Sequence, residues 1–300
     1  MKKVVISGRS MPAIGIGTWH MGNSNSLRKQ EIEAIRTGIE NGLQLIDTAE
    51  MYGNGKSELL VGEAIKPYNR DQLYIVDKVL PSNASHARLE RSLDSSLKKV
   101  GVDYFDLYLY HWRGGVTLEE TIFELNRMVL KGKIKAWGVS NFDVDDMEEL
   151  LTVPHGKDCA ANEDLYNIGN RGIDFDLIEW QRQHNIPLIA YSPVSQGDSL
   201  GKNLTTNEVI MEIAQNHGIT PYQVLLAWAI RNPQTIAIPQ TSNPKHMLDN
   251  VKAASLELTS EDLTLIDKEF PKPKKKKYLE MLYNTGSENN DKCNQIERRG

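Results

Sequence analysis

Four ionisable side chains stand at or just after the ends of predicted buried strands. Asp47 ends residues 43–47, and Tyr52 follows it in a polar loop. Lys78 ends residues 73–78, and His111 comes directly after residues 105–110. Because parallel strands of an alternating β/α chain end at the same face of the sheet, we expect these four side chains to share one site.

The types of these residues indicate proton donation. A tyrosine, with a reference pKa of about 10, becomes a useful acid only where its phenolate is stabilised. Lys78 beside Tyr52 lowers the pKa of the phenol, Asp47 beside Lys78 keeps the ammonium charged, and His111 orients the oxygen that receives the proton. The sequence offers neither an activated nucleophile nor a metal-binding motif. This set favours carbonyl reduction with a hydride from a bound cofactor.

Other interpretations of the same residues remain open. Asp47 and Lys78 are also compatible with a buried structural ion pair, and His111 with a hydrogen-bonded core histidine. A barrel aldolase or isomerase would use Lys78 to form a Schiff base, but Asp47 would keep that lysine charged. Borohydride trapping with a carbonyl ligand separates this class from a reductase.

Strands and helices alternate along the chain. After a hairpin at residues 3–14, inner strands are predicted to begin near residues 14, 43, 73, 105, 134, 160, 187 and 236. Helices are predicted at residues 27–41, 57–65, 85–100, 118–130, 144–151, 175–184, 208–217, 222–231, 245–254 and 260–270. The pattern predicts an α/β fold, a (β/α)8 TIM barrel with an N-terminal β-hairpin and extra C-terminal helices. The alternative, an open doubly wound sheet, normally has a Gly-rich turn after its first strand. Here Gly15 and Gly17 lack the rest of that fingerprint and indicate tight packing.

Composition limits the possible partners. The 300 residues carry a net charge of −5, which gives no general attraction to nucleic acid or to an anionic membrane and favours a small-molecule partner. The two cysteines form no metal or disulfide pattern, no apolar run is long enough to span a bilayer, and the start does not resemble a signal peptide. We expect a cytoplasmic protein with one domain over residues 1–271. The tail at residues 272–300 is predicted to be solvated around the lysines at 274–277 and disordered from 285 to 300.

The motifs along the chain resemble those of the aldo-keto reductase family over nearly all of residues 1–271. They are DTAEMYG at 47–53, LYLYHW at 107–112, GVSNF at 138–142, AYSP at 190–193 and Ile238-Pro239. The opening GTWHMG at 17–22 resembles bacterial reductases of small aldehydes and methylglyoxal.

The resemblance implies a role for each matched residue. Asp47, Tyr52, Lys78 and His111 form the catalytic tetrad, and Trp19 and Trp112 line the substrate pocket. Ser140 and Asn141 bind the nicotinamide carboxamide, with Tyr191 stacked on the ring and the loop from Ser192 and Pro193 on the pyrophosphate. Glu163, Gln240, Thr241, His246 and Asn250 complete the expected cofactor contacts. NADP(H) is the cofactor expected from the family, no metal is expected, and the family is most often monomeric.

The sequence departs from the family pattern in two regions, and the first is the run at residues 162–164. Glu163 stands where the family usually has a Gln that contacts the carboxamide. It no longer donates a hydrogen bond when ionised, and its charge then favours the oxidised cofactor. Asp164 alternates to the opposite face of the strand, where an apolar residue is expected. This altered run supports a rival function, a cofactor-binding regulatory or sensor protein with slow turnover.

The second departure concerns the 2′-phosphate of NADPH. Family members that prefer NADPH have Lys and Arg at the positions of Gln240 and His246. Without these cations the charge-assisted pairing is lost, so we expect a weakened preference for NADPH and the use of NAD(H) as an alternative cofactor. Arg113, after Trp112, is interpreted either as an exposed loop residue or as a contact for an anionic substrate group.

Overall fold

The centre of the molecule is a closed barrel of parallel strands. The computed structural model describes residues 1–195 and 204–282. Eight strands within them lie in the order β10-β9-β8-β7-β6-β5-β4-β3, and all neighbours are parallel. They are β3 (Ile16–Gly17), β4 (Leu45–Asp47), β5 (Tyr74–Val79), β6 (Phe105–Tyr110), β7 (Ile134–Ser140), β8 (Asn162–Leu165), β9 (Leu188–Tyr191) and β10 (Thr235–Ala237). A parallel bridge between Ile14 and Ala237 joins the first strand to the last, which closes the predicted (β/α)8 barrel.

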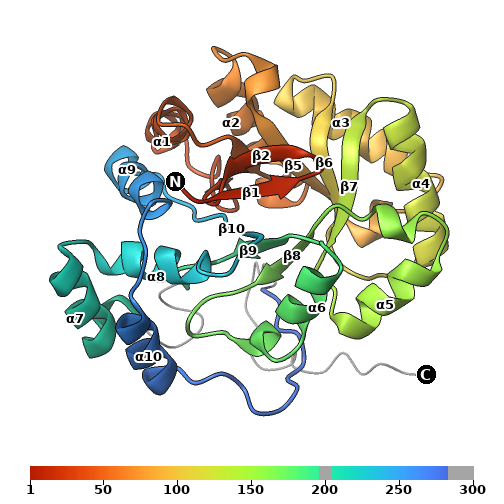
Figure 1. Ribbon diagram of the computed structural model, residues 1–300. Helices are drawn as coiled ribbons and strands as arrows, with labels where there is room; N and C mark the ends of the chain where they lie inside the picture. Colours follow the sequence, from red (N-terminus) through yellow and green to blue (C-terminus); the bar gives the residue numbers. More distant parts are fainter. Residues whose placement is uncertain (196–203, 283–300) are drawn as a thin grey trace, which may run out of the picture.

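Helices surround the barrel (Figure 1). They are α1 (Arg28–Glu40), α2 (Lys56–Ile65), α3 (Leu89–Val100), α4 (Leu118–Leu130), α5 (Val144–Thr152), α6 (Leu177–Gln183), α7 (Glu208–His217), α8 (Pro221–Ala229), α9 (Pro244–Ala253) and α10 (Ser260–Glu269). Helix α7 packs against both α8 and α10. The predicted elements are confirmed in type and order, with shifts at their ends. The largest shift is at α3, which begins at Leu89 instead of residue 85, because residues 86–88 form a turn in which His86 N donates to Glu120.

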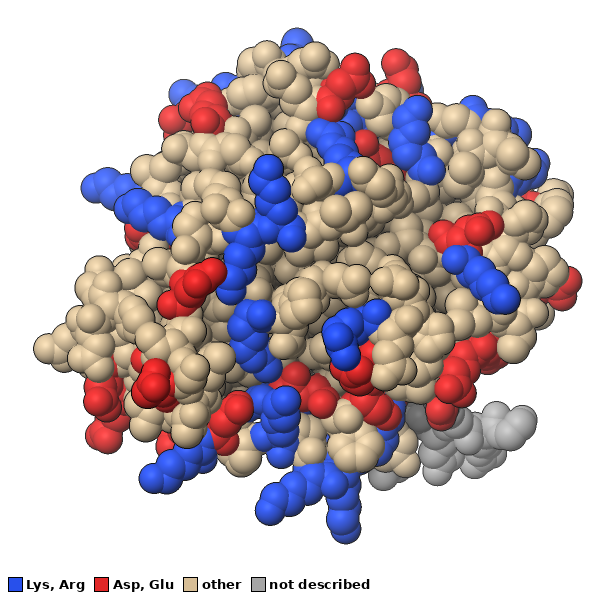
Figure 2. All heavy atoms as spheres, in the orientation of Figure 1, with Lys and Arg blue, Asp and Glu red and all other residues tan. Residues whose placement is uncertain are grey.

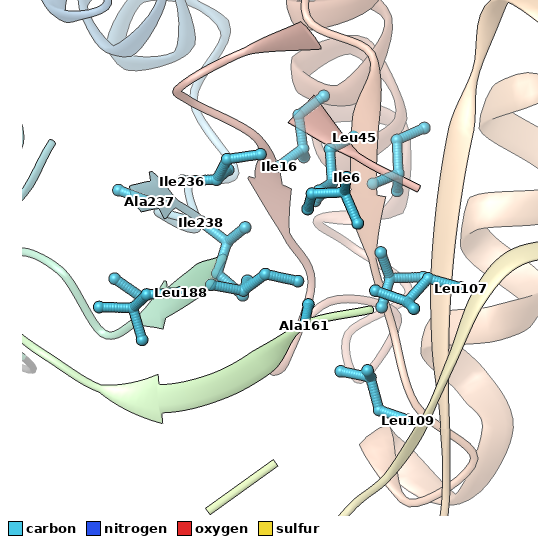
Figure 3. Close-up of a cluster of buried hydrophobic side chains, with 14 of the residues drawn as sticks. Ile6, Ile16, Leu45, Leu107, Leu109, Ala161, Leu188, Ile236, Ala237 and Ile238 are labelled. Carbon is cyan, nitrogen blue, oxygen red and sulfur yellow. The ribbon is translucent and has the colours of Figure 1, made fainter. Parts of the chain in front are cut away.

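The barrel interior is filled with apolar side chains. Ile16, Leu45, Leu107, Leu188 and Ile236 come from five different strands and point toward one another (Figure 3), and each is at most 3% exposed. Burial of each such side chain contributes about 1.5–3 kcal/mol. The barrel is therefore a packed core, and a ligand has room only at its ends.

The N-terminal hairpin closes one end of the barrel. Strands β1 (Lys3–Ile6) and β2 (Arg9–Pro12) pair antiparallel across Ser7 and Gly8, whose positive φ angles of 48° and 79° suit a two-residue turn. Arg9 Nη1 donates to the carbonyl of Leu73, just before β5. The hairpin therefore covers the N-terminal ends of the strands (Figure 1), and the C-terminal ends remain for a site.

The chain after α10 returns to the barrel. Lys276 Nζ lies 2.6 Å from Asp143 Oδ1 and 2.7 Å from Asp176 Oδ2, next to α5 and α6. Lys276 is exposed, as expected for the lysine run, and in addition it forms these two ion pairs. The rest of the tail, predicted to be disordered from residue 285, lies outside the described residues.

Charges on the surface are mixed. Figure 2 shows basic and acidic side chains interspersed over the face seen in Figure 1. Within the described residues no helix is both long and apolar enough to cross a membrane.

Candidate active site

Lys78 is the centre of a buried polar cluster at the C-terminal ends of the strands. Its Nζ lies 2.6 Å from both carboxylate oxygens of Asp47 and 3.2 Å from Tyr52 Oη. Lys78 is fully buried on β5, Asp47 ends β4, and Tyr52 begins the short 3-10 helix η1 (Tyr52–Gly55). Three side chains predicted from their positions at strand ends thus come into direct contact.

The position of Asp47 is fixed by hydroxyl groups beneath it. Thr18 Oγ1 donates to the main-chain oxygen of Asp47 at 2.7 Å, and Ser57 Oγ donates to Thr18 Oγ1 at 2.7 Å. Ser57 also lies 3.1 Å from Thr48 Oγ1. The loop after β3 and the start of α2 are therefore tied to the strand end that presents the carboxylate.

Burial changes the acidity of Tyr52. Desolvation raises the pKa of the phenol, the charge of Lys78 opposes this rise, and Asp47 and Glu163 add to it. The predicted effect of Lys78 is present, but the net direction is upward because desolvation is the larger effect. Tyr52 thus holds its proton at neutral pH, as a proton donor must.

His111 lies on the other side of Tyr52. The two rings meet edge to face with centroids 6.0 Å apart. Burial, and then the charge of Lys78, lower the pKa of His111 well below its usual range. Its Nδ1 has no hydrogen-bond partner within the described residues. The ring is therefore neutral and can donate one hydrogen bond.

Ser140, Asn141 and Tyr191 form a fixed polar wall beside this cluster. Asn141, in a left-handed conformation at φ 59°, donates to the His111 carbonyl at 3.1 Å and to Ser140 Oγ at 2.9 Å. Its Oδ1 accepts from Tyr191 Oη at 2.8 Å, and Ser140 Oγ donates to the Glu163 carbonyl at 2.9 Å. The three side chains that the resemblance assigns to the nicotinamide therefore hold one another in place.

Glu163 belongs to the same charge cluster. Its Oε1 lies 3.3 Å from Lys78 Nζ, and its Oε2 has no hydrogen-bond partner in the described part of the chain. Burial raises the pKa of Glu163 well above its usual range, with Asp47 adding to the rise and Lys78 opposing it. The ionised state, on which the sequence-based expectation depended, is therefore disfavoured, and a protonated carboxyl can donate a hydrogen bond as a Gln does.

Asp164 points to the other side of the barrel wall, as the strand alternation predicted. It is completely buried, and within the described residues neither carboxylate oxygen has a hydrogen-bond partner. Burial raises its pKa well above the usual range, and Asp143 and Asp146 raise it further. Asp164 is thus a buried carboxyl at a position where the sequence pattern led us to expect an apolar residue.

Two cavities open beside Tyr52. A small one of about 40 Å³ is lined by Trp19, Trp112, His111 and Glu163, and also by Met281 and Leu282 from the returning chain. The sequence interpretation missed Met281 and Leu282, although they follow Leu279 as a short apolar group in a polar tail. Both tryptophans lie where a substrate pocket was expected.

The larger cavity, of about 490 Å³, runs from Tyr52 past Tyr191, Ser192 and Pro193 to Gln240. Its wall includes Gly17, where an added Cβ would come within 2.5 Å of the Ile238 carbonyl oxygen. That glycine is therefore required for close strand packing, in agreement with the sequence interpretation. Of the loop assigned to pyrophosphate, residues 196–203 lie outside the described residues.

Of the four residues expected to contact the adenosine end of the cofactor, Gln240 lines this cavity, whereas Thr241, His246 and Asn250 lie beyond its described lining. Gln240 is exposed and its Oε1 accepts from His20 N at 3.1 Å. Thr241 Oγ1 accepts from Asn243 N at the start of α9. His246 is exposed on the first turns of α9, and Asn250 is buried one turn further along it.

Arg113 does not face the cavity as an unpaired cation. It donates to both oxygens of Glu149 at 2.8 and 3.1 Å and lies 3.4 Å from Asp146 Oδ1, both on α5. These ion pairs favour a structural interpretation over a substrate contact.

Comparisons with known proteins agree on one family. The family model described as Aldo/keto reductase family matches residues 13–269. The methylglyoxal reductase YeaE of Escherichia coli K12 is 44% identical over 94% of this chain and 99% of its own length. The glyoxal reductase of Bacillus subtilis is 32% identical over 87% of this chain and 90% of its own length.

Solved structures give the same result. An aldo/keto reductase from Klebsiella pneumoniae, in complex with NADP and acetate, superposes with a TM-score of 0.92 at 42% identity. The match covers 94% of this chain and 99% of that chain. The thermostable aldo-keto reductase Tm1743 superposes with a TM-score of 0.81 at 37% identity, covering 89% of this chain and 99% of that one.

Proposed function

We propose that Tyr52 is the proton donor of this enzyme. The chain belongs to the aldo/keto reductase family, and it is an oxidoreductase that reduces carbonyl groups with a nicotinamide cofactor. The observation that carries this proposal is Lys78, whose ammonium lies between the Asp47 carboxylate and the Tyr52 hydroxyl beside a cavity. We further propose small 2-oxoaldehydes such as methylglyoxal as the substrate class. The narrow cavity between Trp19 and Trp112 and the similarity to reductases of methylglyoxal and glyoxal support that choice.

The proton transfer follows from the geometry of the cluster. A carbonyl oxygen bound near Tyr52 gains negative charge during reduction, and the neutral phenol donates its proton to that oxygen. The phenolate that forms lies 3.2 Å from Lys78 Nζ, which stabilises it. Asp47, with two 2.6 Å contacts, keeps Lys78 charged and directed toward Tyr52 throughout.

His111 orients the substrate in this proposal. As a neutral imidazole it donates one hydrogen bond to the carbonyl oxygen without adding a positive charge that would compete with Lys78. The edge-to-face contact of its ring with Tyr52, at 6.0 Å between centroids, supports a role in which both donors share one oxygen.

The larger cavity fits the cofactor that the family uses. Its volume of about 490 Å³, its aromatic wall at Tyr191 and its path toward Gln240 suit an extended dinucleotide. Ser140 and Asn141 would hold the carboxamide, and Tyr191 the face of the ring. The chemistry that a reduced nicotinamide supplies, once bound, is a hydride for the carbonyl carbon.

We propose NADP(H) as the cofactor, with measurable use of NAD(H). Structures of similar proteins in complex with NADP and with NADPH support the first part. The neutral side chain of Gln240 and the exposed His246 support the second, because neither provides a permanent cation for a 2′-phosphate. A monomeric, cytoplasmic enzyme remains part of the proposal.

The function is tested by titrating the protein with NADPH and NADH and then following oxidation of each on addition of methylglyoxal. We expect turnover with both, at saturating methylglyoxal. Cofactor binding without turnover across a panel of small aldehydes would contradict the proposed substrate class.

Cofactor preference has its own test in Gln240→Lys. A lysine there supplies the missing cation, so NADPH should bind about tenfold more tightly, equivalent to about 1.4 kcal/mol, while NADH binding stays the same. The control is Gln240→Met, which also removes the acceptor for His20 N but adds no charge. Equal changes in both variants would show that the 2′-phosphate lies elsewhere.

A further inference from the structure

The barrel end holds more carboxyl groups than cations. Asp47 and Glu163 both contact Lys78, and all three side chains are at most 2% exposed. One ammonium cannot balance two carboxylates where water is excluded, because an unbalanced buried charge is strongly disfavoured. One of the two carboxyls must therefore hold a proton or acquire another cation.

The distances decide which carboxyl holds the proton. Lys78 Nζ approaches both oxygens of Asp47 at 2.6 Å but only one oxygen of Glu163, at 3.3 Å. The ammonium stabilises the ionised form of the carboxyl that it contacts more closely, and this is Asp47. Glu163 thus carries the proton, and its raised pKa has the same direction.

The second oxygen of Glu163 is left without a partner beside the cavity. Its Oε2 is buried without a hydrogen-bond partner in the described residues, and Glu163 lines the cavity with Ser140, Asn141 and Tyr191. In the proposed function these three residues hold the nicotinamide, whose ring is positively charged only when oxidised. A positive ring beside Glu163 favours the ionised carboxyl, whereas a neutral reduced ring does not.

We propose that Glu163 is a proton switch tied to the redox state of the cofactor, releasing its proton when the oxidised nicotinamide binds and keeping it when the reduced one binds. In this step the carboxyl O–H bond breaks, the proton passes to solvent, and the carboxylate remains beside the ring. The inference rests on the proposed function, because it requires the nicotinamide at this site.

Other titratable groups face Glu163 from every side of the cluster. Asp47 comes from β4, Lys78 from β5, Tyr52 from η1, His111 from the loop after β6 and Tyr191 from β9. Burial raises the pKa of Tyr52 and of Tyr191, so both stay neutral, and the lowered pKa of His111 keeps it neutral as well. Asp47 and Lys78 remain paired, which leaves Glu163 as the group in this set that responds to the ring.

The switch also affects Tyr52. An ionised Glu163 adds to the rise in the pKa of Tyr52. A protonated Glu163 in the complex with reduced cofactor removes that contribution and leaves the charge of Lys78 less opposed. Glu163 therefore acts through Tyr52 and does not itself contact the reacting atoms. Its protonation in the complex with reduced cofactor makes Tyr52 a stronger acid in the complex that reduces the substrate.

The test is calorimetric binding of NADP+ and of NADPH in buffers with different ionisation enthalpies, which counts the protons released per molecule bound. We expect NADP+ to release up to one proton more than NADPH. As pH rises, the dissociation constant of NADP+ should fall by up to about tenfold per pH unit, whereas that of NADPH should change little. The comparison of the two cofactors cancels proton exchange by their phosphates.

Two variants make the assignment specific. Glu163→Gln keeps a donor and an acceptor but cannot ionise, so the difference between the cofactors should vanish. Asp164→Asn removes the adjacent buried carboxyl on the other face of β8 and should leave the difference unchanged. Equal proton release for NADP+ and NADPH in the unmodified protein, or a difference that survives in Glu163→Gln, overturns the inference alone. Failure of both cofactors to bind overturns the proposed function and the inference with it.

Discussion

Strand β8 presents two adjacent buried carboxyls to two different environments. Glu163 faces the barrel interior, where it shares Lys78 with Asp47 and lines a cavity. Asp164 faces the opposite side of the wall, where its described surroundings give it no hydrogen-bond partner and the charges that act on it are those of Asp143 and Asp146. The two are equally buried, at 1% and 0% exposure. The two carboxyls therefore differ in their surroundings and not in their burial, because only the inner one contacts a cation and lines a cavity.

If the inner side of the wall carries the chemistry, a change there should affect catalysis far more than stability. Tyr52→Phe removes the proposed proton donor, so kcat for methylglyoxal should fall by about 100- to 10,000-fold. The dissociation constant for NADPH should stay the same, and the free energy of unfolding should change by no more than about 1 kcal/mol. Steady-state kinetics, cofactor titration and urea denaturation measure the three quantities. Retained turnover would remove Tyr52 from the acid role.

A change on the outer side of the wall should affect stability and leave catalysis unchanged. Asp164→Val replaces an unpaired carboxyl with an apolar side chain, which should raise the free energy of unfolding by about 1–3 kcal/mol at pH 7. The value of kcat/KM should remain unchanged, because Asp164 faces away from the cavity.

The pH dependence of this gain has a definite sign. The pKa of Asp164 is raised in the folded protein, so as pH rises above about 3.9, its ordinary value, the unfolded chain loses this proton first. Stability of the unmodified protein therefore falls as pH rises toward the folded pKa, and the advantage of Asp164→Val should be smallest below about pH 4. Urea denaturation across a pH series measures it, with Asp164→Asn as the control that removes the ionisation but keeps a polar group. A gain independent of pH would mean that Asp164 does not titrate between these states.

The smallest effect is expected at Lys276, on the edge of the outer side. Lys276 pairs with Asp143, one of the charges that disfavour ionisation of Asp164. All three partners of this ion-pair group are partly exposed, so Lys276→Ala should lower the free energy of unfolding by less than about 1 kcal/mol. Lys275→Ala, at the exposed neighbouring position, is the matched control. A loss of several kcal/mol in Lys276→Ala would show that the returning chain stabilises the barrel far more than these exposed pairs suggest.

The sequence by itself determined the order and type of the elements and the residues at the strand ends. Apolar runs separated by amphipathic stretches are local features, and the polar residue that follows each run is visible without knowing the fold. Asp47, Lys78 and His111 could therefore be assigned to one end of a barrel. The alternation along β8 was enough to place Asp164 on the face opposite Glu163.

Only the tertiary structure decided the pKa shifts in the site and which residues from the C-terminal part of the chain line its small cavity. Desolvation depends on how completely neighbours far apart in the sequence exclude water, so the raised pKa of Tyr52 and that of Glu163 could not be derived from strand positions. Met281 and Leu282 reach the cavity only because the chain after α10 returns across the barrel, held in part by Lys276. These properties arise from contacts between distant segments, and no local pattern specifies them.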